Sequence, residues 1–271
     1  MRPTGVRAFA RAVTDDDLLR YSRHLLLDDI GIEGQARIGA AHVLVIGAGG
    51  LGSPVALFLG SAGVGRLTLV DGDTVDLTNL QRQIAHDLST LGTPKAASAA
   101  RRVGAINPRI EVVALDERVA GDRLDALVAA ADVVVDCSDN FATRQAVNAA
   151  CVRHGRPLVA GAAIVFDAQI SVYDTRRAES PCYACVFPPD AAVEDVACST
   201  MGVFAPIVGI VGSMQAAEAL KLVAGIGSSL AGRLQMLDAR AMAWTEMRIE
   251  RDPACPVCAV RPAPGGAVSA C

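Results

Sequence analysis

Lys95 is one of only two lysines in a chain of 271 residues, which otherwise draws its positive charge from arginine. It follows a glycine-rich stretch, GAGGLG (residues 47–52), that comes directly after an apolar run. In such a loop, backbone N–H groups approach a phosphate at the positive end of the next helix. A lone lysine placed shortly after the loop indicates a site that acts on phosphates as well as holding them.

Polar residues after the next apolar run give this site a more specific chemistry. Asp71 comes about twenty residues after the loop, where a carboxylate accepts hydrogen bonds from ribose hydroxyls. The loop and Asp71 alone favour a nicotinamide dinucleotide. Asn79, Arg82 and Lys95 favour a different reaction, because two cations and an amide stabilise the charge that develops on an attacked triphosphate. The alternative is that Arg82 and Lys95 are solvated charges at helix ends. The sequence contains no GxxxxGK[ST] loop, which excludes an ordinary P-loop NTPase.

The DCSDN sequence (residues 136–140) ends a predicted buried strand, at the edge where open α/β sheets bind ligands. Mg²⁺ usually takes one or two carboxylates together with substrate phosphates. We therefore assign Asp139 to a magnesium ion and give Asp136 a structural role. The alternative is that one of these two aspartates caps the helix predicted from Thr143 onward.

Four of the eight cysteines form two CxxC pairs, Cys182 with Cys185 and Cys255 with Cys258. Each pair can supply two thiolates to a tetrahedral Zn²⁺ ion. The pairs are about seventy residues apart, so the metal would staple a cysteine-rich loop to the C-terminal part of the chain. Four thiolates leave no open coordination position, and we expect a structural metal. The alternative is a set of reduced thiols in the core.

Cys198 lies outside both pairs, in an irregular stretch before a long apolar helix. Loops of this kind often present reactive groups, and a nucleophilic cysteine acts as its thiolate. A small buried side chain is an equally good interpretation. Cys137 and Cys151 are expected in the core. The histidines have no spacing typical of a triad or a metal site, and we expect structural roles for His24, His42, His86 and His154.

Apolar runs that alternate with helical patterns must position these groups. The expected strands are 42–46, 66–71, 110–115, 132–136 and 157–160, and the expected helices are 53–62, 95–105, 122–130 and 143–154. This alternation predicts an α/β fold with a Rossmann-like, doubly wound, mostly parallel sheet. We also expect two short helices within residues 18–41. After residue 161 the expected features are antiparallel strands (165–174, 233–238 and 242–251), an irregular stretch (175–204) and a long apolar helix (204–224).

Length and composition set further limits. We expect an N-terminal extension (1–17), a single domain (18–260) and a disordered tail (261–271). A net charge of −4 creates no field that attracts nucleic acid or an anionic membrane. The first 17 residues lack the charged-then-apolar pattern of a signal peptide, so we expect a cytoplasmic protein. Residues 197–217 carry no charge but contain Ser, Thr, Gln and Pro, which favours a buried segment over a membrane span.

Ordered motifs over roughly residues 18–258 resemble the ThiF-type adenylyltransferases that activate ubiquitin-like sulfur carriers. These motifs are RYSRH, GAGGLGS, LVDGDTVDLTNLQRQ, GTPKA, DCSDN, PCYAC, the segment 201–206 and CPVC. The family includes molybdopterin-synthase adenylyltransferase, the thiazole-biosynthesis adenylyltransferase and the adenylation halves of ubiquitin-activating enzymes. The resemblance implies that the chain uses ATP and Mg²⁺ to adenylate the C-terminal glycine carboxylate of a small carrier ending in Gly-Gly.

The resemblance also implies roles for individual residues. Asp71 would hold the ribose, Asp139 would hold Mg²⁺, and Arg23 would reach the phosphates across a homodimer. Cys198 matches a position where some relatives link covalently to the carrier, while in others the thiol is dispensable. The expected catalytic residues are Arg23, Arg82, Lys95, Asp139 and Cys198. The residues expected at ATP are Gly47, Gly49, Gly50, Gly52, Asp71, Asp73, Thr78, Asn79, Leu80, Gln81, Arg82, Lys95, Asp139 and Asn140. The expected ligands of structural zinc are Cys182, Cys185, Cys255 and Cys258.

The expected partners follow from the same resemblance. No rhodanese sequence follows Cys258, so we expect the sulfur to come from a cysteine desulfurase or a rhodanese in trans. Carriers of the molybdopterin and thiamine pathways fit equally well. Two alternatives stay open: a nicotinamide-dependent Rossmann oxidoreductase, and a non-catalytic scaffold that binds a carrier without adenylating it.

Overall fold

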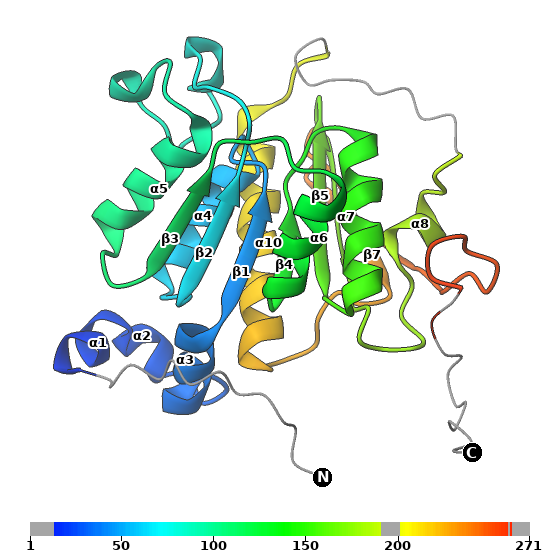
Figure 1. Ribbon diagram of the computed structural model, residues 1–271, viewed down its shortest axis with the longest axis horizontal. Helices are drawn as coiled ribbons and strands as arrows, with labels where there is room; N and C mark the ends of the chain where they lie inside the picture. The colour runs from blue at the N-terminus through cyan, green and yellow to red at the C-terminus, as the bar shows by residue number, and fades with distance from the viewer. Residues whose placement is uncertain (1–13, 191–200, 260, 262–271) are drawn as a thin grey trace.

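An eight-stranded sheet forms the centre of the computed structural model, which describes residues 14–190, 201–259 and 261 (Figure 1). The order across the sheet is β3-β2-β1-β4-β5-β6-β7-β8. The strands from β3 to β5 in this order are parallel. Each following neighbour pairs antiparallel. The strands are β1 (His42–Ile46), β2 (Arg66–Val70), β3 (Glu111–Leu115), β4 (Val133–Asp136), β5 (Leu158–Ile164), β6 (Asp167–Tyr173), β7 (Arg233–Asp238) and β8 (Ala243–Arg248). The predicted parallel sheet with an antiparallel extension is confirmed.

Helices cover both faces of the parallel strands (Figure 1). The apolar cluster on one face includes side chains of α4 (Gly52–Ser61), α5 (Lys95–Ile106) and α10 (Ala205–Ala224). The cluster on the other face includes side chains of α6 (Gly121–Ala130) and α7 (Phe141–His154). The sheet is therefore the middle layer of three, which is the arrangement that a doubly wound fold requires.

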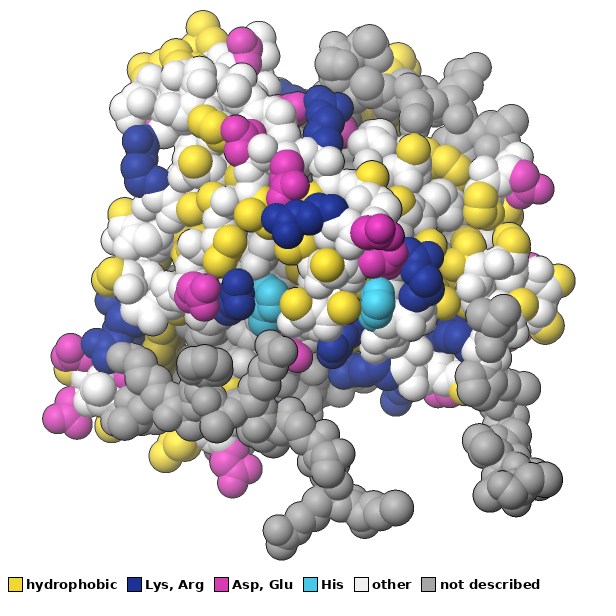
Figure 2. Space-filling model, in the orientation of Figure 1, with side chains coloured by type: hydrophobic (Ala, Val, Ile, Leu, Met, Phe, Trp, Pro, Cys, Tyr) yellow, Lys and Arg dark blue, Asp and Glu magenta, His cyan; other side chains and the backbone are white. Residues whose placement is uncertain are grey.

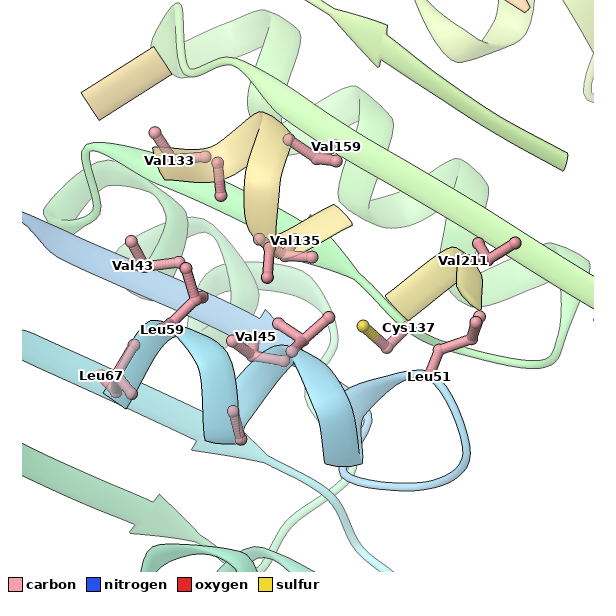
Figure 3. Packing of buried hydrophobic residues seen from close by; sticks show 14 of the residues in the cluster. Val43, Val45, Leu51, Leu59, Leu67, Val133, Val135, Cys137, Val159 and Val211 are labelled. Carbon is pink, nitrogen blue, oxygen red and sulfur yellow. The ribbon is translucent and has the colours of Figure 1, made fainter. Parts of the chain in front are cut away.

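After His42, its first residue, β1 has only apolar side chains, and their packing explains why. Val43 and Val45 belong to the cluster under α4 and α10, whereas Leu44 and Ile46 belong to the cluster under α6 and α7. A strand that is buried on both faces reads as a continuous apolar run. Figure 3 shows the first cluster, in which side chains of β1, β2 and β4 pack with those of α4 and α10. Each fully buried Val or Leu contributes roughly 1.5–3 kcal/mol relative to an exposed one.

The long apolar helix predicted at residues 204–224 is α10. It is long and apolar enough to cross a membrane by length and composition alone. Half of its most apolar window is buried inside the molecule, and the helix packs against α4, β5 and β6. This packing supports the prediction of a buried core helix for the described part of residues 197–217; residues 197–200 lie outside the described ranges.

The amino-terminal region differs from the prediction of two short helices. Within residues 14–41 it forms three: α1 (Asp15–Arg20), α2 (Ser22–Leu25) and α3 (Gly31–Ala40). A capping box starts the first one, because the Thr14 hydroxyl accepts from the Asp17 N–H while the Asp17 carboxylate accepts from the Thr14 N–H. These helices lie at the end of the sheet opposite to the loop between β1 and α4 (Figure 1).

Three short elements were not predicted. The 3₁₀ turns η1 (Leu77–Asn79) and η2 (Leu88–Thr90) lie between β2 and α5, and α8 (Tyr183–Val186) lies within the stretch expected to be irregular.

On the molecular surface, Lys and Arg side chains are interspersed with Asp and Glu on the face shown in Figure 2. The predicted domain bounds stay a prediction.

Candidate active site and metal centre

A cleft of about 900 Å³ opens at the carboxyl ends of the parallel strands. Its lining includes the loop after β1, the ends of β2 and β4, and residues of β5, β6 and β7. The chain leaves β1 toward α4 on one face and leaves β4 toward α7 on the other face. Open α/β sheets bind their ligands at such a switch point, and the volume lies in the range usual for small-molecule sites.

The loop of residues 47–52, here called the glycine loop, requires glycine at two positions. Gly47 has a φ of +95°, and a Cβ on it would lie 2.7 Å from the carbonyl oxygen of Cys137. A Cβ on Gly52 would lie only 1.9 Å from the carbonyl oxygen of Gly47. A larger residue would therefore push the loop away from β4 or open the start of α4. Gly47, Gly49 and Gly50 line the cleft, and Gly52 is the first residue of α4 behind it.

Asp71 connects the end of β2 to the glycine loop. One carboxylate oxygen accepts from the Ala48 N–H at 2.7 Å, and the other accepts from the Asp73 N–H at 2.9 Å. Asp71 lines the cleft and is half-buried. Each oxygen keeps a further lone pair, so these bonds are compatible with the ribose contact that the sequence predicts.

Lys95 begins α5 and projects to the cleft wall, where its Nζ lies 3.0 Å from Asp73 Oδ2. The lysine is 8% exposed. The second oxygen of Asp73 accepts from the Arg118 guanidinium at 2.7 Å. The hydrogen bond from Lys95, together with the charges of Lys95 and Arg118, lowers the pKa of Asp73 below its usual value of 3.8. One carboxylate thus holds two cations at the wall of the cleft.

The remaining predicted residues of the cleft come from two separate elements. Arg82 follows η1 and donates to the carbonyl oxygen of Thr78 at 3.2 Å. Asp139 is exposed and lines the cleft at the end of β4. Asn140 also lines the cleft, but its side chain accepts from the Thr143 N–H at 2.8 Å and caps α7. The sequence analysis considered Asp136 or Asp139 as the cap of this helix. The residue that caps it is Asn140.

Asp136 has the structural role that the sequence predicts. It is 1% exposed, and Oδ1 accepts from the Ser138 N–H at 2.9 Å. Burial raises the pKa of this carboxyl group. Cys137 and Cys151 are buried, and burial raises the pKa of both thiols. The prediction that these two cysteines lie in the core is confirmed.

Some predicted residues lie outside the lining of the cleft. The residues of the η1 turn pack on each other, since Asp76 accepts from Thr78 while Asn79 accepts from Asp76. Arg23 is exposed on α2, at the opposite end of the sheet (Figure 1). Cys198 lies outside the described residues. The expected contacts of ATP with Thr78, Asn79, Leu80 and Gln81, and the role of Arg23, stay predictions.

Several residues that line the cleft were not singled out from the sequence. Gln83 is 4% exposed, and a Cβ on Gly49 would lie 3.6 Å from its amide nitrogen. Arg118 lies in the loop that follows β3, and Arg144 lies in the first turn of α7, where it donates to the Ser138 carbonyl. Gln83 is part of the motif around Asn79, and that motif could have indicated it. The two arginines could not have been found in this way, because an arginine after a strand does not indicate a binding site in a chain rich in arginine.

The four paired cysteines meet at one point. Their sulfur atoms all lie within 4.8 Å of one another, and the closest pairs are 3.5 Å (Cys185–Cys258) and 3.7 Å (Cys182–Cys255) apart. Four sulfurs about 2.3 Å from a central Zn²⁺ are about 3.8 Å from each other, so the cluster has the dimensions of a tetrahedral site. Asn148 donates to the Cys182 sulfur at 3.6 Å and so supports the cluster from α7.

The fold and the cleft define a nucleotide-binding α/β protein with a cysteine cluster of zinc-site geometry. The ThiF family model matches residues 21–257, and the chain belongs to the ThiF family. This confirms the resemblance on which the residue assignments depend.

Individual relatives agree with this membership. The chain is 45% identical over 246 residues to the sulfur carrier protein ThiS adenylyltransferase of Escherichia coli (strain K12), covering 91% of this chain and 97% of the relative. It is 41% identical over 249 residues to the molybdopterin-synthase adenylyltransferase of Salmonella typhimurium (strain LT2), covering 91% and 98%. The crystal structure of E. coli MccB with ATP matches with a TM-score of 0.75 at 22% identity, over 88% of this chain and 73% of that one, which shows the shared fold.

Proposed function

We propose that this chain adenylates the C-terminal carboxylate of a small ubiquitin-like sulfur-carrier protein with ATP, giving an acyl-adenylate and pyrophosphate. The single observation that carries the proposal is the convergence of the glycine loop, Lys95, Arg82 and Asp139 on one cleft. These groups come from four separate parts of the chain. The names of the relatives support the same reaction, because they are adenylyltransferases of sulfur-carrier proteins and of molybdopterin synthase.

The two halves of the cleft suit the two substrates. The half beside the glycine loop carries the cations Arg82, Lys95, Arg118 and Arg144. The part formed by the antiparallel strands is lined by small and apolar side chains, among them Ala162, Ala163, Ile164, Met236 and Leu237, and also by the polar side chains of Asp167, Gln169 and Asp238. A triphosphate fits the first half, and an extended chain end with glycine residues fits the second. The two would meet where the carboxylate reaches the α-phosphorus.

The proposed step is an in-line displacement. A carboxylate oxygen of the carrier forms a bond to the α-phosphorus of ATP, and the bond between that phosphorus and the bridging oxygen to pyrophosphate breaks. The carboxylate is already ionised at neutral pH, so no general base is required. Catalysis then consists of positioning and charge neutralisation. We assign the neutralisation to Lys95 and Arg82, with Arg23 supplied by a partner subunit.

Two metals fit the residues present. The Asp139 carboxylate is exposed in the cleft, and one carboxylate with substrate phosphates is a usual donor set for Mg²⁺. When bound there, Mg²⁺ would neutralise charge on the leaving pyrophosphate. The cysteine cluster would hold Zn²⁺ in a purely structural role, because four thiolates fill its coordination sphere.

We further propose a homodimer and a sulfur donor that acts in trans. Within one chain, Arg23 lies at the far end of the sheet from the cleft (Figure 1), so a contribution to catalysis requires a second copy. The acyl-adenylate is a good acylating agent for a persulfide, which a cysteine desulfurase or rhodanese would provide. The cysteines of the described residues form no disulfide, which, together with the use of ATP, is consistent with a cytoplasmic protein.

The experiment that tests the function is ATP–pyrophosphate exchange with a purified carrier ending in Gly-Gly. We expect exchange that depends on the carrier and disappears when its last glycine is removed. If the protein binds the carrier but catalyses no exchange, the result favours the alternative of a non-catalytic scaffold. A melting temperature raised by NADH and unchanged by ATP would instead favour the nicotinamide-dependent alternative.

A further inference from the structure

The peptide groups on both sides of Ala48 are fixed by residues outside the glycine loop. The Ala48 N–H donates to Asp71 Oδ2 at 2.7 Å. The Ala48 carbonyl oxygen lies 3.0 Å from His86 Nε2. His86 is 7% exposed and lies behind the loop, outside the lining of the cleft. Its other ring nitrogen, Nδ1, is 2.9 Å from the hydroxyl oxygen of Ser98 on α5.

These contacts determine the state of the imidazole. A carbonyl oxygen only accepts, so Nε2 carries a proton and donates to Ala48. Burial lowers the pKa of His86 below its usual 6.5, and the positive charge of Lys95 adds to this effect; the hydrogen bond to Ala48 and the charges of Asp71 and Asp87 raise the pKa but do not cancel the shift. The ring is therefore neutral near pH 7, and its Nδ1 accepts from the Ser98 hydroxyl. His86 joins the glycine loop to the helix that begins with Lys95.

The orientation of the Ala48 carbonyl decides which group the loop offers to a ligand. In a planar trans peptide, the carbonyl of Ala48 and the N–H of Gly49 point in opposite directions. The carbonyl points back to His86, so the Gly49 N–H is turned toward the cleft that Gly49 lines. No protein group accepts from this N–H within the described residues. A reversed peptide would instead present a carbonyl oxygen to the phosphates, which repel it.

We propose that His86 is a positioning residue for ATP: by holding the Ala48 carbonyl, it keeps the Gly49 N–H directed at the phosphate chain. This inference rests on the proposed function, since it assigns the phosphates of ATP to the glycine loop. It gives His86 a role beyond the structural one that the sequence predicts. The residue touches neither substrate, and it acts only through the loop.

Two substitutions of similar size separate this role from simple packing. In His86→Gln the amide nitrogen reaches the place of Nε2, so the donation to Ala48 is kept and the contact with Ser98 is lost. In His86→Asn the amide reaches the place of Nδ1, so the contact with Ser98 is kept and the donation to Ala48 is lost. Ser98→Ala is the matched control, because it removes the second contact and leaves the histidine in place.

The measurement is the Kd of ATP and of adenosine for each folded variant, with melting temperatures alongside. For ATP we expect His86→Asn to bind roughly tenfold more weakly, the value of one lost hydrogen bond, and His86→Gln and Ser98→Ala to bind like wild type. For adenosine, which has no phosphates, we expect all four proteins to be alike. Wild-type ATP affinity in His86→Asn, or an equal loss for adenosine, would overturn the inference. A wild-type enzyme that binds ATP but gives no exchange contradicts the proposed function and leaves the role of His86 standing.

Discussion

Lys95 Nζ lies 3.0 Å from Asp73 Oδ2, and the same aspartate also holds Arg118. The two residues of the lysine pair are 22 positions apart, on opposite ends of the segment between β2 and α5. The lysine side chain is only 10% exposed, so the carboxylate compensates for burial of its charge while leaving two N–H groups for a ligand. The cleft is thus prepared for phosphate before a nucleotide arrives.

The first prediction concerns this lysine. Lys95→Ala should lower carrier-dependent ATP–pyrophosphate exchange by roughly 100-fold or more, because it removes a preorganised cation from the transferring phosphate. The chain has a matched control in its only other lysine, Lys221, which pairs with Glu218 on α10. Lys221→Ala should lower the melting temperature and leave the exchange rate of the folded enzyme near wild type. Equal exchange in both variants would remove Lys95 from the mechanism.

The second prediction concerns the magnesium ion. Asp139→Asn should raise the Mg²⁺ concentration needed for half-maximal exchange by roughly tenfold or more, since a neutral amide binds a hard cation more weakly than a carboxylate. Asp116→Asn changes an exposed aspartate that does not line the cleft and serves as the control. A magnesium titration of both variants measures the effect, and superimposable curves would contradict the assignment.

The third prediction concerns the cysteine cluster. Cys255→Ser should reduce the zinc content from about one ion per chain and destabilise the fold by roughly 4 kcal/mol, the chain entropy of a closed loop of this length. The loop joins residues 73 positions apart. The control is Cys151→Ala, which changes a residue of α7 in the apolar core. This variant should also lower stability but keep the metal. Elemental analysis decides the point: a wild-type protein purified without zinc, and unchanged by adding it, is incompatible with the proposed site.

The fourth prediction concerns Arg23 and the dimer. Arg23→Ala and Lys95→Ala should each be inactive alone. A mixture in which the subunits exchange should regain about a quarter of wild-type activity, because half of the dimers are mixed and half of their sites are intact. Activity that stays at zero after verified exchange, or an active Arg23→Ala enzyme, would show that the arginine does not act across an interface.

The fifth prediction is a loss of stability in mild acid. The pKa values of His42 and His86 both lie below the usual 6.5, chiefly because of burial. Below pH 6.5 the unfolded chain therefore binds more protons than the folded one. As the pH is lowered, the free energy of unfolding decreases until both imidazoles are protonated in the folded protein as well. The pKa of Asp73 is also lowered, so its contribution is present above pH 3.8 and is lost as pH falls through the lower, folded value.

Urea unfolding between pH 8 and pH 5 measures the histidine effect. His86→Gln should show a shallower dependence on pH in this window, because one of the two imidazoles with a lowered pKa is gone. An identical pH dependence in the variant would mean that His86 titrates normally in the folded protein.

The features that were predictable from the sequence are those encoded locally. Residues 43–46 of β1 are buried on both faces of the sheet, and a segment buried in this way is recognisable in the sequence as an uninterrupted apolar run. The start of α1 at Asp15 is also encoded locally, since Thr14 and Asp17 have the spacing of a capping box, but the predicted helical region begins three residues later, at residue 18. The helix cap at Asn140 was missed because three polar residues in a row could each have filled that position.

The contacts that the sequence could not reveal join residues that are distant along the chain or chemically common. Nothing local indicates that Asp73 meets Lys95 and Arg118, because the pairing depends on how β2, β3 and α5 come together. The donation from His86 to Ala48 spans 38 positions. A buried histidine with no partner in its own segment is ordinarily a core residue, and only the fold shows which peptide it holds.

The cysteine cluster also has a consequence for how the protein is made. Cys182 and Cys185 emerge from the ribosome well before Cys255 and Cys258, and β7 and β8 lie between the two pairs. A Zn²⁺ ion at the proposed site could complete its coordination only when the last of these thiols has been synthesised. The parallel strands of a nascent chain would then be complete before the metal joins the antiparallel end of the sheet to the rest of the protein, and this last step of folding would depend on the supply of zinc.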